Sequence, residues 1–378
     1  MKILHLITDL DIGGAEMMLY NLLKIPPTPG TMTSVVSLID LGIIGSRIQQ
    51  LSIPVKSLGM HSGRPDLRAL WRLVIWLRRD PPDLMQTWMY HADLLGGVAA
   101  RLAGNMPVIW GIHHTLGGEQ PLQPRTMAVL RLNAILSNWM PRRVICCAET
   151  ACDAHEQVGY SATKMIVIPN GVDTERFHPD KQERSSVRQE LSVTPDTRLI
   201  GMFARFHPQK DHHTFIEAAR LLHAKLPHVH FVLGGDGMTS LNDPLQDWIR
   251  TAELSSHVHL LGLRQDIPRL MAAMDIVSLS SSFGEALPLV IAEAMACGIP
   301  AVVTDVGDAS RLVGITGRIV PTRDPVALSN AWEELIRLPE HDRSLLGQKA
   351  RSRIEQEYNI VSIAERYYSL YKSVLVNN

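Results

Sequence analysis

This sequence of 378 residues has few cysteines, few aromatic side chains and no long hydrophobic run. The four cysteines fit neither the spacing of a zinc ribbon nor a disulfide framework, so we expect reduced, mostly buried thiols. The longest unbroken apolar runs, such as LVIWL at 73–77, are far too short to span a bilayer. The apolar run in MKILHLITDLD is cut short by Asp9, which predicts a buried first strand and not a secretory signal. A cytoplasmic protein is therefore expected. The cysteines are Cys146, Cys147, Cys152 and Cys297.

The chain also lacks a large net charge, because its formal charge at pH 7 is −1. This balance gives no general attraction to nucleic acid, and we expect no nucleic-acid partner. Charge is nevertheless uneven, since residues 61–145 contain ten arginines, no lysine and five acidic residues. Two interpretations remain open for this segment: core helices with solvated arginines, or a surface that contacts anionic lipid. The same segment holds Trp71, Trp76, Trp88, Trp110 and Trp139, five of the seven tryptophans.

Short apolar strands alternate with amphipathic helical stretches, which is typical of parallel βαβ units. The polar stretch 172–190 is interpreted as a linker that ends in a short helix. We therefore predict an α/β protein with two Rossmann-like domains, residues 1–185 and 186–357. An amphipathic helix at 358–378 could pack on either domain and is expected on the first. The predicted strands are 2–8, 33–39, 84–88, 107–112, 143–148, 165–170, 198–204, 229–235, 258–262, 276–281 and 301–305.

Ligands of open α/β sheets bind at the carboxyl ends of the strands, where helix N-termini attract phosphate. In SSFGEALPLVIAEAMACGIP (281–300), Pro288 suits the first helical turn and Gly298 suits the helix end. Glu285 then lies in the loop, and Glu293 lies inside the helix, about 7.5 Å from Pro288 along its axis. The two carboxylates are interpreted as sugar-hydroxyl acceptors at two ends of a binding site, or alternatively as ordinary surface glutamates. The amides expected to cradle an anion are those of Glu285, Ala286, Leu287 and Leu289.

Two further loops are candidates for binding phosphate. Arg205 and Lys210 follow a predicted strand and could neutralise a diphosphate together. Gly13 and Gly14 lie between the first strand and its helix, where backbone can approach a ligand closely. The D-x-D at residues 9–11 invites a metal interpretation, which we discount because the phosphates already have cationic and amide partners. No metal is expected.

Other patterns carry less. The glycine-rich turn LGGDGM (233–238) does not fit G-x-G-x-x-G, so a dinucleotide site is not supported. The histidine pairs 228/230 and 257/259 each lie on one face of a predicted strand. Solvated strand ends are favoured over a metal site for them, since no third ligand is evident in the sequence.

In this order, the motifs resemble the GT-B-fold glycosyltransferases of family 4, the group 1 glycosyltransferases. The resemblance implies two Rossmann-like domains facing a central cleft. It also implies transfer of a sugar from a UDP- or GDP-linked donor, with retention of anomeric configuration and without a metal or other cofactor. The acceptor would be a glycan, a lipid-linked molecule or a small molecule. The matching motifs are GGAE (13–16), PNGVD (169–173), ARFHPQKD (204–211), GGDG (234–237), LGLRQDI (261–267) and E-x7-E (285–293).

Roles for individual residues follow from this resemblance. Arg205 and Lys210 would stabilise the leaving nucleoside diphosphate, Glu285 would bind hydroxyls of the donor sugar, and Glu293 would bind the ribose. His113 is preferred over His114 as the histidine near the donor sugar, because it directly follows a predicted strand. The stretch VGDASRLVG (306–314) departs from the family pattern, which puts a role for that loop in doubt. Phosphate contacts are implied for Gly13, Gly14 and the amides of Ala286 to Leu289, and a place beside the base for the backbone near Arg264.

Nothing in the sequence identifies a covalent nucleophile, so a front-face attack assisted by the departing phosphate is the working hypothesis. Two alternatives are a nucleotide-sugar epimerase of the same fold and a non-catalytic sugar- or nucleotide-binding protein. A further expected partner is the inner face of a membrane, which residues 61–145 would contact peripherally. The expected pathway is polysaccharide biosynthesis.

Overall fold

The computed structural model describes residues 1–378 except 12, 27–28, 62–65, 117–122 and 377–378. The chain divides into two compact units. Unit 1 contains Met1–Gly171 and Ile360–Asn378, and unit 2 contains Val172–Asn359. The division therefore lies before the expected boundary near residue 185, and the C-terminal segment belongs to unit 1.

The described part of unit 1 contains a seven-stranded parallel sheet. Its strands are β1 (Lys2–Ile7), β2 (Met32–Ser37), β3 (Val55–Ser57), β4 (Leu84–Trp88), β5 (Val108–Ile112), β6 (Arg143–Cys146) and β7 (Met165–Val167). Their order is β3-β2-β1-β4-β5-β6-β7, the strand order of a doubly wound fold. The strand at 55–57 was not predicted, because Val55 is its one apolar residue. Each of the other strands lies at a predicted position.

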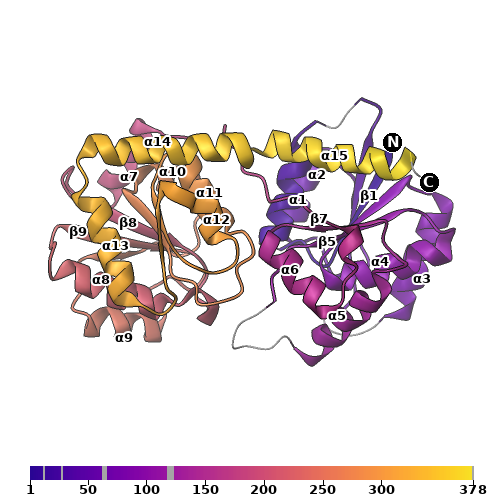
Figure 1. Cartoon of the computed structure of the whole chain (residues 1–378), viewed down its shortest axis with the longest axis horizontal. Helices are drawn as coiled ribbons and strands as arrows, with labels where there is room; N and C mark the ends of the chain where they lie inside the picture. Colours follow the sequence, from indigo (N-terminus) through magenta and orange to yellow (C-terminus); the bar gives the residue numbers. More distant parts are fainter. Residues whose placement is uncertain (12, 27–28, 62–65, 117–122, 377–378) are drawn as a thin grey trace. The chain divides into compact units, whose positions relative to one another are not determined.

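Helices cover both faces of this sheet (Figure 1). The helices are α1 (Gly14–Lys24), α2 (Gly42–Gln50), α3 (Leu67–Arg79), α4 (Tyr90–Ala103), α5 (Pro124–Leu136), α6 (Glu149–Val158) and α15 (Ile360–Val376). Alternate residues of β1 point to opposite faces: Ile3 and Ile7 join the core with α1, α2 and α15. Leu4 and Leu6 join the core with α3, α4 and α5. Because successive side chains of a strand point to opposite faces of the sheet, this one apolar strand contributes to both cores.

Helix α15 completes the first of these cores. Tyr367 and Tyr371 are fully buried, and the ring of Tyr367 stacks on that of Trp88 with the centroids 6.1 Å apart. No described helix is long and apolar enough to cross a membrane. The four cysteines are present as thiols, and three of them are buried, as expected.

Unit 2 repeats the architecture with a six-stranded parallel sheet in its described residues. Its strands are β8 (Arg198–Phe203), β9 (Val229–Gly234), β10 (Val258–Leu260), β11 (Ile276–Leu279), β12 (Ala301–Thr304) and β13 (Arg318–Val320). The order β10-β9-β8-β11-β12-β13 is again that of a doubly wound sheet. Five of these strands were predicted, and β13, with three residues, was not.

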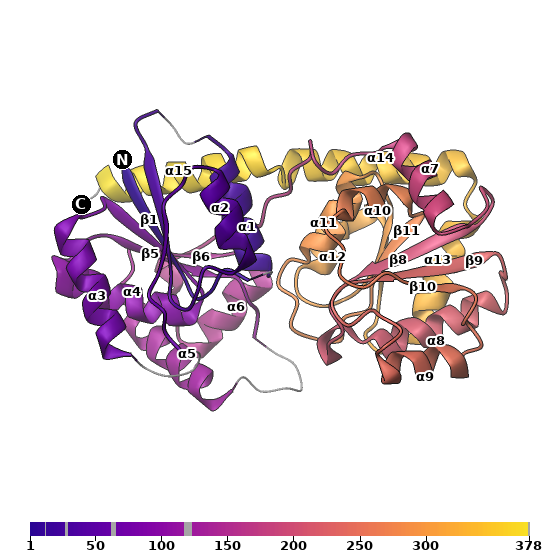
Figure 2. The same ribbon diagram turned by 180° about the vertical axis from the view of Figure 1, so that it is seen from behind.

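The helices of unit 2 also form two layers (Figures 1 and 2). Helices α8 (His212–His223), α9 (Asp243–Thr251) and α13 (Pro325–Arg337) lie on one side of the sheet. The other side carries α7 (Lys181–Glu190), α10 (Ile267–Ala273), α11 (Leu289–Ala296), α12 (Ala309–Val313) and α14 (Glu340–Glu357).

Helix α7 explains why the segment expected to be a linker belongs to unit 2. Arg184 donates to the carbonyl oxygens of Ala273 and Met274 at the end of α10, each at 2.8 Å. It also pairs with the buried carboxylate of Asp275 at 2.8 Å, and Arg188 pairs with the same carboxylate at 3.5 Å. Cations are favoured at a helix C-terminus, so these arginines fasten α7 to the end of α10.

Helix α14 holds α11 in place through direct backbone contact. A Cβ atom at Gly347 would overlap the carbonyl oxygen of Gly298, which follows the C-terminal end of α11. Arg351, one turn further along α14, donates to the carbonyl oxygen of Ala296 in α11. Only glycine permits this approach, so α14 fixes the position of α11 within unit 2.

We expect Gly347→Ala to destabilise unit 2 by about 1–3 kcal/mol, because the added methyl group overpacks a backbone contact. The test is the thermal unfolding midpoint measured by circular dichroism. Ser352→Ala, at an exposed position of the same helix, is the matched control and should leave the midpoint unchanged. A Gly347→Ala variant as stable as the control would contradict the prediction.

Candidate active site

The site in unit 2 is built where its sheet changes winding direction. Strands β8 and β11 are neighbours, with Ile200 paired to Ile276, although they are far apart in sequence. The loops that leave their carboxyl ends, 204–211 and 280–288, therefore meet at the switch point where open α/β sheets bind ligands. The predicted residues Arg205, Lys210 and Glu285 lie on these two loops.

The structure brings Lys210 and Glu285 together in a buried pair. The Nζ atom of Lys210 donates to Oε1 of Glu285 at 2.5 Å, and the side chain of Glu285 is 9% exposed. The same oxygen accepts from Oγ of Ser281 at 2.7 Å and from Nε2 of Gln209 at 3.4 Å. No described residue donates a hydrogen bond to Oε2. One carboxylate oxygen is thus fixed by the protein, while the other keeps its acceptor capacity.

Serines that sequence analysis did not single out join the two loops. Oγ of Ser280 donates to the carbonyl oxygens of Lys210 and Asp211, at 2.9 and 3.0 Å. The amide of Ser282 donates to the carbonyl oxygen of Gln209 at 2.9 Å. Asp211 also caps α8 by accepting from the amide of Thr214. The run of three serines at 280–282 was the available signal for this connection.

Arg205 differs from Lys210 in its surroundings. Its side chain is exposed and forms no hydrogen bond or ion pair with the described residues. The charge of Lys210 is balanced by Glu285, whereas that of Arg205 is not balanced by any described carboxylate. His207 lies near both cations, and burial together with their charges lowers its pKa. The loop therefore carries one uncompensated positive charge, at Arg205.

The helix that follows Glu285 begins one residue later than predicted. Pro288 is the N-cap of α11 rather than a residue of its first turn, and Leu289 is the first helical residue. The carbonyl oxygen of Pro288 accepts from the amides of Ile291 and Ala292. First-turn amides have no acceptor within their own helix, so those of Leu289 and Val290 remain as donors for a ligand.

Gly307 and Asp308 support the loop that carries Glu285. Gly307 has φ +60°, and a Cβ atom there would overlap the carbonyl oxygen of Glu285. The amide of Asp308 donates to the carbonyl oxygen of Ala286 at 2.8 Å. The stretch 306–314, whose role the sequence left in doubt, therefore holds Glu285 and Ala286 in position. Ala286 and Leu287 are both buried.

Glu293 lies inside α11, and its carboxyl group has an unusual environment. Burial raises its pKa to about 7, and the nearby Arg176 acts in the opposite direction. The Glu293 side chain makes no hydrogen bond with the described residues. A carboxyl group with this pKa changes its protonation state near neutral pH.

Arg264 has a side chain committed to the protein. Its guanidinium pairs with Asp266 at 2.6 Å and with Glu190 of α7 at 2.7 Å, and these bonds raise its pKa. Its side chain therefore ties the loop after β10 to α7, and only its backbone is left for the expected role beside a base.

In unit 1, Gly13 and Gly14 lie at the N-terminus of α1, near acidic side chains. Gly13 is the N-cap, and a Cβ atom there would overlap the carboxylate of Glu16, which lies over it. Burial, together with the charges of Asp9 and Asp11, raises the pKa of Glu16 to about 7. These carboxylates repel phosphate, so the surroundings of Gly13 and Gly14 are less favourable to an anion than those of Arg205.

His113 directly follows β5 and stacks on Trp88, with ring centroids 4.7 Å apart and planes at 19°. Burial lowers its pKa to about 4, so the ring is neutral at pH 7. The nearby side chain of Asn170 raises the pKa of His113, against the effect of burial. The two side chains are not in hydrogen-bond geometry. Both ring nitrogens are buried without a hydrogen-bond partner among the described residues. His114, the other candidate, is half-buried.

Unit 1 also contains a cavity of about 670 Å³ at the carboxyl ends of β1 and β2. Its polar lining residues are Thr8, Asp9, His61, Asp66, His91, Gln123, Arg125 and Thr126. Most of its wall is apolar and comes from α3, α4, α5 and the loop after β2. The apolar lining includes Leu38, Ile39, Met60, Leu67, Leu70, Leu94, Leu95, Val98 and Val129.

Four histidines lie close together near β9 and β10: His230 in β9, His259 in β10, His257 just before β10 and His223 in α8. Nδ1 of His230 lies 3.0 Å from Nε2 of His259, and the rings of His223 and His257 are 4.0 Å apart. Within the described ranges, no group of three or more His, Cys, Asp or Glu side chains is arranged to hold a metal ion.

Two family models match the chain. Residues 12–176 match Glycosyltransferase Family 4, and residues 197–337 match Glycosyl transferases group 1. The UDP-Gal:alpha-D-GlcNAc-diphosphoundecaprenol alpha-1,3-galactosyltransferase of Escherichia coli is 28% identical over 318 residues, which cover 82% of this chain and 81% of that protein.

Solved structures give the same result. Anabaena HepE in complex with UDP superposes with a TM-score of 0.87 and 28% identity, over 99% of this chain and 100% of that one. Sucrose-phosphate synthase of Thermosynechococcus elongatus shares the fold, with a TM-score of 0.81 and 20% identity over the full length of both chains. These relatives favour sugar transfer over the epimerase and binding-protein alternatives. With matches across both parallel-sheet α/β units, the chain has the GT-B fold, belongs to the group 1 glycosyltransferases of family 4, and is a nucleotide-sugar-dependent glycosyltransferase.

Proposed function

We propose that this enzyme transfers a hexosyl group from a UDP-sugar to a lipid-linked glycan, with retention of anomeric configuration, in polysaccharide biosynthesis. The observation that carries the proposal is the likeness, over nearly its whole length, to Anabaena HepE, which has been solved with UDP and with UDP-glucose. The name of the Escherichia coli relative adds a UDP-linked donor and a diphosphoundecaprenol-linked acceptor.

Arg205 is the main cation for the leaving group in this proposal. Cleavage of the anomeric C–O bond leaves negative charge on the departing diphosphate, and preorganised positive groups lower that barrier. Arg205 has no competing carboxylate, whereas Lys210 must share its charge between Glu285 and a phosphate oxygen. The first-turn amides of α11 supply a partial positive charge as well. In this arrangement, side chains and amides supply the charge that a divalent cation would otherwise bring.

Glu285 is proposed to position the donor sugar. Its Oε1 atom is held by Lys210 and Ser281, which leaves Oε2 to accept a sugar hydroxyl. The neutral ring of His113, in unit 1, is proposed to contact the sugar as well. Because Glu285 is assigned to binding, retention is proposed to arise by front-face attack, with the departing phosphate taking the proton of the acceptor hydroxyl.

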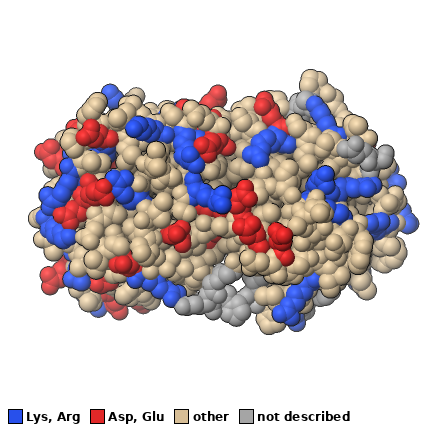
Figure 3. Space-filling model, viewed as in Figure 1, with Lys and Arg blue, Asp and Glu red and all other residues tan. Residues whose placement is uncertain are grey.

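The acceptor is proposed to bind unit 1 in the apolar cavity next to α3. Leu67 lines this cavity and is 72% exposed. It begins a stripe that continues along α3 with Trp71 and Ile75, four residues apart, which are 52% and 45% exposed. Arginines flank the stripe, and Figure 3 shows basic side chains and few acidic ones on the surface near α3. An apolar stripe with flanking arginines suits an anionic membrane surface, and a peripheral place on the inner face follows as part of the proposal.

Arg205→Gln should lower kcat by about 100- to 1,000-fold, because a developing charge loses its cation. Stability should not change, since Arg205 contacts no described partner. The measurement is steady-state release of UDP from a UDP-sugar, alongside the thermal midpoint. Lys181→Gln, which removes an exposed cation from the same unit, is the control. An Arg205→Gln enzyme with control-level turnover would remove this residue from the mechanism.

Donor affinity should depend on pH through Glu293. The carboxylate accepts ribose hydroxyls, and with a pKa of about 7 it becomes protonated as the pH falls from 8 to 6. The KM for the donor should therefore rise as the pH falls through about 7. Glu293→Gln should have a higher KM at pH 8 and lose this dependence. Glu340→Gln, at an exposed position, should keep it. Identical pH profiles for Glu293→Gln and the wild type would refute the assignment.

The double variant Leu67→Gln/Trp71→Gln should bind anionic vesicles less than the wild type, because the apolar part of the contact is lost. Co-sedimentation with vesicles of phosphatidylcholine, with and without phosphatidylglycerol, measures this. Ile43→Gln, which alters an exposed apolar residue on α2, is the control. Binding of the wild type should weaken with salt. Equal sedimentation with both kinds of vesicle at low salt would rule out the contact.

A further inference from the structure

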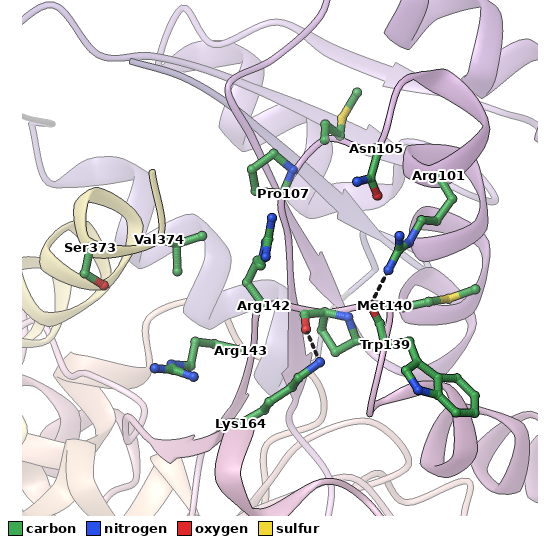
Figure 4. A pocket seen from close by; sticks show the side chains of 12 residues that line it. Arg101, Asn105, Pro107, Trp139, Met140, Arg142, Arg143, Lys164, Ser373 and Val374 are labelled. Atoms are coloured by element: carbon green, nitrogen blue, oxygen red, sulfur yellow. Dashed lines mark hydrogen bonds between the residues drawn. The ribbon is translucent and has the colours of Figure 1, made fainter. Parts of the chain in front are cut away.

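A second cavity in unit 1, of about 320 Å³, lies at the amino edge of the sheet (Figure 4). Pro107 precedes β5, Arg143 begins β6 and Lys164 precedes β7, and all three line it. Parallel strands all begin at the same edge, so this cavity and His113 lie at opposite edges of the sheet. The acceptor and donor roles proposed above do not use it.

Four cations surround this basic pocket, which is defined by Arg101, Arg142, Arg143 and Lys164. No aspartate or glutamate is among its lining residues. Like charges at close range repel, and the effect is visible at Lys164: burial lowers its pKa, and the charges of Arg142, Arg101 and Arg143 lower it further. An anion in the pocket would relieve this repulsion.

The protein fixes Lys164 and Arg101 in advance. Nζ of Lys164 donates to the carbonyl oxygens of Asn138 and Pro141, at 2.6 and 2.9 Å. Arg101 reaches from α4 and donates to the carbonyl oxygen of Trp139. Cations held in this way lose little further freedom when an anion binds.

Arg142 and Arg143 extend from consecutive positions at the start of β6 (Figure 4). Both side chains are exposed, and that of Arg143 donates no hydrogen bond to a described residue. A guanidinium fork can bind two phosphate oxygens at once, which makes arginine well suited to phosphate recognition. The pocket thus combines two fixed cations with exposed arginine forks.

An exposed apolar ridge leads to the pocket. Leu132, Ile135 and Trp139 follow one another at spacings of three and four residues, and are 43%, 59% and 64% exposed. Trp139 also lines the pocket. A ligand with an anionic head and an apolar substituent would satisfy both features.

We propose that the basic pocket binds a phosphate or pyrophosphate group. Two sources supply this chemistry: the headgroup of a membrane lipid, and a soluble phosphate compound. The apolar ridge beside the pocket favours the lipid source. The site is independent of the donor site in unit 2, so either assignment can fail without the other.

Calorimetric titration of the full chain with inorganic phosphate and pyrophosphate, in a buffer free of other phosphate, tests the proposal. We expect the wild type to bind pyrophosphate, and each arginine removed to weaken binding about tenfold, since it removes a charge-assisted hydrogen bond. Arg142→Gln/Arg143→Gln should therefore weaken it about 100-fold. Arg131→Gln removes the same charge from an exposed site on α5 that does not line the pocket, and should bind as the wild type does. UDP binding, measured in parallel, should be equal in all variants.

Vesicles of phosphatidylcholine containing phosphatidic acid distinguish the two sources. If pyrophosphate displaces the wild type from them and the double variant binds them less than Arg131→Gln, the pocket holds a lipid phosphate. If only pyrophosphate binding depends on the arginines, the pocket serves a soluble phosphate compound. The single variant Arg143→Gln keeps the test valid if the double variant does not fold. Absence of pyrophosphate binding to the wild type, or equal binding to wild type and variants, would overturn the proposal.

Discussion

The reversal of winding between β8 and β11 is the constraint on which the donor site depends. It places Lys210 and Glu285, 75 residues apart in sequence, in one ion pair whose side chains are 17% and 9% exposed. Buried pairs contribute little net stability, because desolvation offsets most of their attraction. Removing one partner is nonetheless costly, since it strands the other charge in a buried place. The pair is therefore better explained as a way to hold a carboxylate for substrate than as a way to hold the fold together.

Several contacts around this pair also hold Glu285 and its loop in position. Ser280 and Ser282 join the two loops, and Gly307 allows a turn to support the Glu285 backbone. Helix α14 reaches α11 through the contact of Gly347 with Gly298. These contacts hold the loop 280–288 and the N-terminus of α11 in position. A binding site that depends on precise geometry requires such support.

Much of this architecture is predictable from sequence, because a longer strand is recognised by its run of apolar residues. The short strands VKS (55–57) and RIV (318–320) are not recognised in this way, because they do not extend into a longer apolar stretch as the equally short β7 and β10 do, and only pairing with a neighbour identifies them. The short helix predicted at the end of the polar stretch 172–190 is present as α7, but the sequence did not indicate that this stretch belongs to unit 2. Helix α7 is fastened by arginines to Asp275, a partner about ninety residues away that local pattern cannot reveal.

The candidate site residues were chosen for a different reason, since E-x7-E and the Arg/Lys loop have a recognisable spacing. What spacing could not show is how their charges are distributed. Lys210 is neutralised and Arg205 is not, while the glycines of unit 1 lie beside carboxylates. These differences arise from side-chain packing between distant segments. They give Arg205 and Lys210 different capacities to neutralise a phosphate, although the motif alone does not distinguish them.

The position of α15 has a consequence for biosynthesis. The core of unit 1 includes Tyr367 and Tyr371, which leave the ribosome after every residue of unit 2. Domains generally fold as units during translation. All residues of unit 2 have been synthesised before unit 1 receives its last helix, α15. The core of the first unit therefore stays incomplete until α15 has been synthesised, after the whole of unit 2.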